Sequence, residues 1–389
     1  MISFRRSAIL FALLVMTALS ASPALADSDR NDLDSTGVEV GRYRLQATSY
    51  GSQLATLDGR YRIVKWPEIS TKLPLAPSEC RPWSGSMAFE FTSLCWDAAS
   101  RDDALWYPQG ITGSGESGWS GVASDRHYVI ASWYKRPTAT VKGSVASRIS
   151  ILDAKVGGSY RYRHVTLAVP GTVNGQLTLV PLAIHAGGAA WYGRYLYVST
   201  GYSIWRFDLN HFYDTKSGPA NAYVLPATAV YRSLTVNGRR AVLSSISLDR
   251  STNPPQLVSA QYRGDTTVPT QVIRWPFSSA SLASSGGIVS SVRDYTIDGA
   301  SSIDQVQGVE SHNNTYLFTN TNRKLQRVRP ESTSLRASFP WGPELPNGGS
   351  AVPEDLYGDL SKNQLWGLSE LPGSRYLWYV SFREALGIP

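Results

Sequence analysis

Residues 185–209 read HAGGAAWYGRYLYVSTGYSIWRFDL. A short polar segment with two glycines comes first, and strand-like runs begin at Tyr195 and Ile204. Both runs are rich in β-branched and aromatic residues and are flanked by Gly, Ser or Asn, which is typical of strands. The stretch therefore predicts a short polar inner element followed by two apolar strands.

The same order of segments recurs along the chain, which indicates a repeat architecture. Successive polar elements are separated by steps of 76, 62, 60 and 47 residues, and insertions between strands explain the longer steps. We therefore expect an all-β fold, a single β-propeller of five blades. Six blades are the alternative, because RIVKWP at Arg62–Pro67 echoes VIRWP at Val272–Pro276 and could form a further blade or close the ring against the last one. The residues that mark the polar elements are Gln109, His185, Ser247, Gln307 and Glu354.

The composition supports many short strands and little helix. The chain has 12 Trp, 21 Tyr, 33 Gly and 22 Pro among its 389 residues, a pattern of aromatic-rich strands joined by punctuated turns. A β-sandwich, or a pair of them, would also give short alternating strands. No linker divides the chain, so one propeller domain over residues 42–389 is the favoured interpretation.

The N-terminus has the layout of a secretory signal peptide. Arg5 and Arg6 precede an apolar run over Ala8–Leu19, and a cleavage-site pattern of small residues ends at Ala26. The alternative is a membrane anchor, but the run is shorter than the roughly 18 to 20 residues that a spanning helix needs. We expect a signal peptide over residues 1–26, a flexible leader over 27–41, and a secreted protein without a membrane span.

Export determines how the two cysteines are interpreted. Cys80 and Cys95 lie 15 residues apart, and an exported protein meets an oxidising compartment in which such a pair forms a disulfide. A zinc site is the alternative, but two cysteines without a nearby histidine do not make a tetrahedral ligand set. We therefore predict a Cys80–Cys95 disulfide.

Charge and motifs exclude several functions. The net charge of +7 comes from 37 basic and 30 acidic residues, and no cluster of Lys and Arg predicts a nucleic-acid partner. No calcium loop, zinc-binding histidine pair, nucleophile elbow or nucleotide-binding loop is present. We expect no metal, no cofactor and no catalytic residue, and the chain is interpreted as a binding protein more readily than as an enzyme.

If the polar elements are inner strands, their side chains line one end of a central channel, a usual place for a ligand. Solvation by channel water explains the same polarity without any site. Glu354 and Asp355 are adjacent, so at most one of them is expected to face the channel. A secreted hydrolase, a glycosidase or lactonase using His185, Asp249 and Glu354, is the alternative function. The candidate binding residues are Gln109, His185, Asp249, Gln307 and Glu354, with the aromatic residues Trp106, Tyr107 and Trp191.

Several segments carry a resemblance to a known family. They include LWYPQGITGSGE from Leu105, SIDQVQGVE from Ser302 and PEDLYGDLSKNQLWGLSELPGSRYLWYV from Pro353. From Trp106 to the C-terminus the chain resembles an uncharacterised family of secreted actinobacterial β-propeller proteins. That family is similar to the propeller-type, lectin-like subunits of umbrella toxin particles. The resemblance implies a non-enzymatic adaptor that recognises a cell-surface glycan or a partner protein.

Overall fold

The computed structural model describes residues 41–80, 91–154, 159–215, 223–264, 270–297, 303, 305–321, 324–329, 337–340 and 353–388. All structural statements below concern these residues. The expected signal peptide, and the expected leader up to residue 40, lie outside them.

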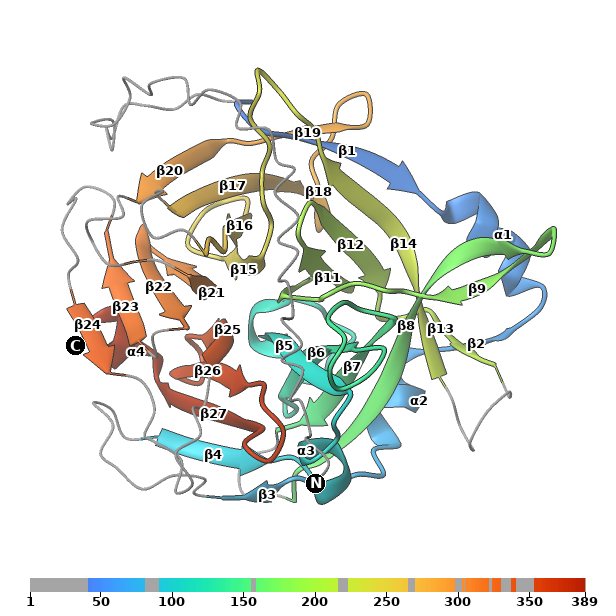
Figure 1. Ribbon diagram of the computed structural model, residues 1–389, viewed down its shortest axis with the longest axis horizontal. Coiled ribbons are helices and arrows are strands. Elements are labelled where there is room, and N and C mark those ends of the chain that lie inside the picture. Colours follow the sequence, from blue (N-terminus) through green and yellow to red (C-terminus); the bar gives the residue numbers. More distant parts are fainter. Residues whose placement is uncertain are drawn as a thin grey trace, which may run out of the picture.

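The centre of the molecule is a closed cycle of inner strands (Figure 1). Each inner strand contacts the next one in chain order, and the last contacts the first. The protein is therefore mostly β, with its sheets arranged around a common axis as in a β-propeller. The inner strands are β5 (Trp106–Gly113), β10 (Gly188–Tyr192), β15 (Ser245–Asp249), β21 (Val306–His312) and β25 (Pro353–Asp359).

Glycine in the polar elements allows the inner strands to approach one another closely. A Cβ on Gly188 would lie 2.3 Å from the backbone nitrogen of Ile246 in the next inner strand. A Cβ on Gly308 would lie 2.7 Å from the Cα of Asp355. The recurrence of glycine beside polar residues in the sequence thus has a direct steric cause.

From each inner strand an antiparallel sheet extends outward (Figure 1). The two strands predicted from Tyr195 and Ile204 are present as β11 (Tyr195–Thr200) and β12 (Ser203–Asp208), which pair antiparallel. From the inner strand outward, the first sheet has the order β5, β6 (Tyr128–Lys135), β7 (Ala146–Asp153), β8 (Arg161–Val173), and the second has β10, β11, β12, β14 (Tyr223–Ser233). The third has β15, β16 (Gln256–Ala260), β17 (Thr270–Ser278), β20 (Arg293–Ile297), and the fourth has β21, β22 (Thr315–Asn320), β23 (Lys324–Val328), β24 (Ala337–Pro340). The last has β25, β26 (Gln364–Ser369), β27 (Tyr376–Ser381), β4 (Phe91–Cys95), β3 (Ser78–Glu79).

The first two of these sheets are joined at their outer edges. Strand β8 pairs in parallel with β14, with Thr166 opposite Val224 and Ala168 opposite Pro226. β8 is 13 residues long and continues into a hairpin with β9 (Gln176–Pro181). This insertion accounts for part of the long first step between polar elements, and it makes the two sheets one continuous surface.

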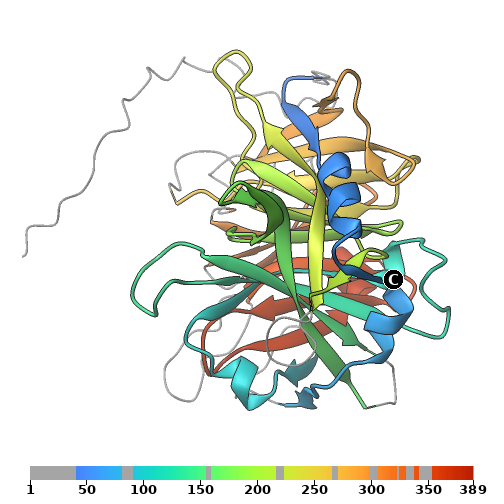
Figure 2. The same cartoon turned by 90° about the vertical axis from the view of Figure 1, so that its right-hand side faces the viewer.

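The segment before the ring packs along its outer edge (Figure 2). β1 (Arg44–Ser49) pairs with both β14 and β19 (Ile288–Ser290), so it adds β19 to the sheet of β14. The helix α1 (Gly51–Asp58) follows β1. The smaller remaining elements are β13 (Phe212–Asp214), β18 (Ser281–Leu282), α3 (Ala98–Arg101), η1 (Ser114–Glu116) and α4 (Phe382–Leu386).

The expected role of Arg62–Pro67 is wrong. Its first residues form β2 (Arg62–Val64), which pairs with β13 beside the second sheet, and Trp66 begins the helix α2 (Trp66–Thr71). Proline at the second position of a helix costs no hydrogen bond, so WP starts a helix here instead of ending a strand. The strand that completes the last sheet is β4, which pairs with β27.

The predicted disulfide is confirmed: Cys80, next to β3, is bonded to Cys95 at the end of β4. Apolar clusters fill the spaces between the sheets. No helix among the described residues is long and apolar enough to span a bilayer.

Candidate functional site

Three inner strands carry a β-bulge at their polar residues. The register shifts between Pro108 and Ile111 in β5, between Val306 and Gly308 in β21, and between Pro353 and Leu356 in β25. A bulge places an extra residue against the partner strand and re-aims its side chain. The strict alternation that we assumed for Glu354 and Asp355 therefore does not hold.

Asp355 occupies the middle of the ring. Its Oδ2 accepts hydrogen bonds from the backbone nitrogens of Ile111 (3.1 Å) and Ala189 (3.0 Å), and its Oδ1 accepts one from Ser245 Oγ (2.9 Å). Ser245 Oγ in turn accepts from the backbone nitrogen of Val309 (2.9 Å). One carboxyl and one hydroxyl thus connect all the inner strands.

At the end where the inner strands begin, six side chains form what we call the entry-end cluster. Gln109 Nε2 donates to Glu370 Oε2, and Arg136 Nη2 donates to the Tyr134 hydroxyl (3.0 Å). The ring of His185 stacks on that of Tyr134 with centroids 4.4 Å apart. The members are Gln109, Tyr134, Arg136, His185, Glu354 and Glu370.

Glu354 is the member of the cluster whose negative charge receives the least stabilisation from neighbouring groups. It is 2% exposed, and no described residue donates a hydrogen bond to its carboxyl group. Burial, with the neighbouring charges of Glu370 and Asp355, raises its pKa well above the ordinary value. The environment thus favours a neutral carboxyl, which can donate as well as accept a hydrogen bond.

Glu370 has different surroundings. Burial raises its pKa, but Arg136, the Gln109 amide and Arg375 oppose that rise. The two carboxyl groups therefore have different electrostatic surroundings, because cations lower the pKa of Glu370 but not that of Glu354. Environments that separate the pKa values of two acids in this way occur in both binding and catalytic sites.

The outer part of the cluster is accessible. His185 is exposed, and Arg136 and Glu370 are half-buried. Enclosure of the imidazole against Tyr134, together with the charge of Arg136, lowers the pKa of His185, although the residue as a whole is exposed. A neutral imidazole offers one hydrogen-bond donor and one acceptor to a ligand.

Two further amides lie near this end. Gln307 is half-buried, with no hydrogen bond from its side chain to the described residues. The Oε1 atom of Gln261, which follows β16, is buried without a partner among the described residues. Buried polar groups in proteins nearly always have a partner, so this oxygen is an acceptor available to a polar ligand.

Comparisons with known proteins give structural likeness alone. No known protein-family profile matches the chain, and no curated protein matches its sequence. The structure of Myxococcus xanthus glutaminyl cyclase is similar with a TM-score of 0.37 and 10% identity, over 72% of this chain and 92% of that one.

Two other solved structures are similar at the same level. Pseudomonas fluorescens PhoX, in complex with vanadate, has a TM-score of 0.44 and 8% identity, over 80% of this chain and 98% of that chain. The beta-propeller domain of Myceliophteria thermophila Cps50 has a TM-score of 0.29 and 13% identity, over 63% and 59%. No function passes from these likenesses to the present chain.

The structure brings some of the predicted residues together. Gln307 and Glu354 are the second residues of their inner strands, Gln109 is the fourth residue of β5, and His185 precedes β10. Asp249 is at the opposite end, because it is the last residue of β15, whereas the first residues of β10 and β15, Gly188 and Ser245, lie against each other. A hydrolase that combines Asp249 with His185 and Glu354 is therefore not supported.

The predicted aromatic residues have structural surroundings. Trp191 is 0% exposed and packs edge-on against Trp66, with centroids 5.1 Å apart, so it belongs to the core and is not available to a ligand. The guanidinium of Arg148 lies 4.2 Å from the ring centroid of Trp106. That of Arg136 lies 3.8 Å from the ring centroid of Tyr107. Both rings hold cations instead of facing open solvent.

Sequence reasoning missed Arg136 and Glu370. Arg136 comes directly after β6 and Glu370 directly after β26, the second strands of their sheets. Because a second strand runs antiparallel to its inner strand, it ends where the inner strand begins. The residue after each second strand was therefore a usable signal. No group of three or more His, Cys, Asp or Glu side chains in the described part of the chain is arranged to hold a metal ion.

Proposed function

We propose that the protein is a secreted, five-bladed β-propeller that binds a hydroxyl-rich ligand, such as a cell-surface glycan, without catalysis. The binding site is the entry-end cluster. The single observation that supports this most strongly is the buried carboxyl of Glu354, which has no hydrogen-bond partner among the described residues. Secretion, and a place in a toxin particle, rest on the signal sequence and the resemblance.

The chemistry of the cluster suits hydroxyl groups. Sugar hydroxyls donate and accept hydrogen bonds, and the cluster offers amides, carboxyls, an imidazole and a guanidinium. Glu370 and Arg136 are half-buried and His185 is exposed, so a ligand would contact them first and reach toward Glu354. Stacking of His185 on Tyr134 fixes the imidazole in place, which reduces the entropy that binding would cost.

The experiment is a glycan array probed with the wild-type protein, followed by titration of the best ligand with three variants. Glu354→Leu removes the polar group and is expected to weaken binding at least tenfold. Glu354→Gln keeps a neutral donor and acceptor, so its affinity should stay within a few-fold of the wild type. Glu384→Gln, an exposed acid on α4, is the control. Equal affinity for all four proteins would remove the cluster from the binding site.

A hydrolase is a second candidate, because the cluster holds two acids with unlike surroundings, and the charge of Glu370 contributes to the raised pKa of Glu354. A neutral Glu354 would be the general acid and Glu370 the base or nucleophile, as in glycosidases. Gln cannot supply the proton, so Glu354→Gln separates the two functions. Retained binding without turnover of any glycoside by the wild type supports the binding protein, whereas turnover that Glu354→Gln abolishes supports the enzyme.

A further inference from the structure

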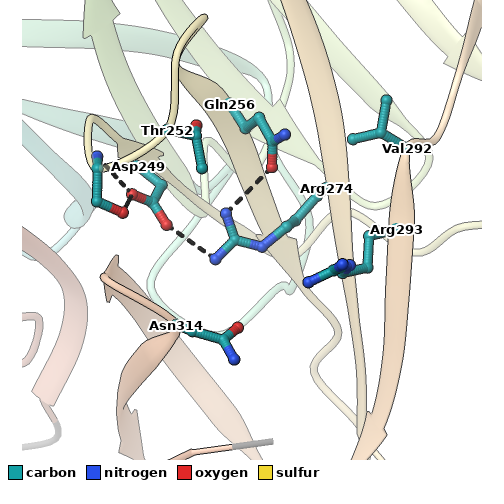
Figure 3. Close-up of a pocket in the computed structure, with 8 residues that line it drawn as sticks. Asp249, Thr252, Gln256, Arg274, Val292, Arg293 and Asn314 are labelled. Atoms are coloured by element: carbon teal, nitrogen blue, oxygen red, sulfur yellow. Dashed lines mark hydrogen bonds and ion pairs between the residues drawn. The ribbon is translucent and has the colours of Figure 1, made fainter. Parts of the chain in front are cut away.

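A second polar site lies away from the entry-end cluster, where the sheets of β15 and β21 face each other. It is a pocket of about 410 Å³, lined among others by Asp249, Gln256, Arg274, Arg293 and Asn314 (Figure 3). Its volume falls within the range of sites for small organic molecules, roughly 300 to 1,000 Å³. The proposed function does not use it.

Asp249 and Arg274 already satisfy each other in this pocket. Arg274 Nη2 lies 2.8 Å from Asp249 Oδ2, and its Nε donates to the Tyr316 hydroxyl (2.7 Å). Burial alone would raise the pKa of Asp249, but Arg274 and the hydroxyl groups of Ser251 and Ser311 outweigh it and lower that pKa. The pair is thus a buried ion pair with no net charge left over.

Arg293 carries a positive charge that the Asp249–Arg274 pair does not neutralise. It lies directly opposite Arg274 in the register of β17 and β20, so both side chains are on the same face of the sheet. The next residue, Asp294, is on the other face and pairs with Arg42 (3.3 Å). The pocket lining therefore holds two arginines and one carboxylate, which leaves one positive charge.

The donors left in the pocket point to an anion. Arg293 Nη1 donates to the Tyr295 hydroxyl (2.9 Å), and its Nε and Nη2 have no hydrogen bond to the described residues. Gln256 accepts from Arg274 through Oε1 (3.2 Å), which leaves its NH₂ group as a donor. An anionic group with two or three oxygens matches a guanidinium fork and an amide NH₂ that line the same pocket.

We propose that this pocket binds the single anionic group of a small organic ligand, a carboxylate, sulfate or phosphate, between Arg293 and Gln256. The anion relieves the repulsion between the two facing arginines. The rest of the pocket holds the uncharged part of the ligand. The site is separate from the entry-end cluster, so the protein has two independent places for ligands.

The test uses four probes on one scaffold: glucuronate, glucose 6-sulfate, glucose 6-phosphate and neutral glucose. Binding to the full secreted chain is measured by calorimetry at low salt. At least one anionic probe should bind at least tenfold more tightly than glucose, and the tightest one identifies the anion class. If no anionic probe binds more tightly than glucose, the proposal is overturned.

Variants identify the residue responsible. Arg293→Gln should weaken binding of the anionic probe at least tenfold, and Arg293→Lys, which keeps the charge without the fork, should weaken it less. Arg232→Gln, an exposed arginine beside Trp205, is the matched control and should bind as the wild type does. Unchanged binding in Arg293→Gln would overturn the proposal.

Thermal stability and a variant of the entry-end cluster provide two independent controls. Removing one of two facing cations should leave the melting temperature of Arg293→Gln equal to or above that of the wild type, so loss of binding is not loss of folding. Glu354→Leu should leave the anion affinity unchanged. Failure of the glycan site and failure of this pocket are thus separate results.

Discussion

The side chain of Asp355 accepts hydrogen bonds from three other inner strands of the ring. Two backbone N–H groups and the Ser245 hydroxyl, from three different strands, donate to its carboxyl group, and the residue is 0% exposed. Such a group is expensive to replace, because the donors that it satisfies are buried with it. Its role is to hold the inner strands in register, in contrast to Glu354, which has no such partners.

The variant Asp355→Asn tests that role. An amide keeps one acceptor but turns an NH₂ group toward donors, so at least one buried donor loses its partner. We expect the free energy of unfolding to fall by about 2 kcal/mol, measured by urea denaturation. Asp102→Asn, an exposed acid that pairs with Arg101, should change it by less than about 0.5 kcal/mol. Equal midpoints for both variants and the wild type would contradict the assignment.

Glu354 leads to a pH-dependent prediction. Its pKa in the folded chain is raised above the reference value of 4.5. Its contribution to stability is therefore fully present below pH 4.5 and is lost as the pH rises through the raised pKa. Because Gln imitates the neutral acid, Glu354→Gln should melt at the same temperature as the wild type at pH 4 and at a higher temperature at pH 8.

Glu68 provides a control of opposite sign. Hydrogen bonds from Arg62 and Lys72 lower its pKa to about 2. Its contribution is therefore present above pH 4.5 and is lost only as the pH falls through about 2. Glu68→Gln should not raise the melting temperature at pH 8, and any effect is small because the group is exposed. A rise at pH 8 in both variants would point to a general charge effect instead of burial at Glu354.

At the scale of single elements, the local sequence pattern was sufficient to predict strands but not to predict which strands pair with each other. The alternation in YLYVST and SIWRFD predicts β11 and β12 and the turn between them. FTSLC, in contrast, is five residues long, and nothing local says that Phe91–Cys95 pairs with β27, far along the chain. The echo of VIRWP in RIVKWP misled for the same reason, since the true partner of β2 is β13.

The candidate site was predictable to a similar extent. Polar residues beside glycine marked the inner strands, and Gln307 and Glu354 are each the second residue of theirs. Asp249 is instead the last residue of β15, because composition does not say where in its strand a polar residue falls. The bulges that re-aim Glu354 and Asp355 depend on the register of neighbouring strands, which the sequence alone does not reveal.

The disulfide stabilises the outermost strands of the last sheet. Cys80 and Cys95 are 15 positions apart in the sequence, and a loop of about that length gains about 3 kcal/mol from closure. The double variant Cys80→Ser, Cys95→Ser should lose about that much free energy of unfolding. Hydrogen exchange should become faster first in β4 and in its partner β27.

Reduced wild-type protein is the matched control for this prediction. It has the same sequence as the oxidised form, so it should reproduce the stability loss of the double variant. Uniform loss of protection over all sheets, without an early change in β4, would show that the bond does not act locally.

For the whole molecule, the outer edge of the last sheet is completed by a strand from the N-terminal part of the chain. β4 covers β27, whose outer edge would otherwise expose unpaired backbone groups and invite pairing between molecules. A chain that begins at residue 98 lacks β4 and should form soluble aggregates or higher oligomers, measured by light scattering after size exclusion. A chain that begins at residue 42 keeps β1 and β4 and should elute as the untruncated protein does. If the shorter chain is as monomeric and as stable as the longer one, the last sheet does not need β4, and the ring is held by its inner strands alone.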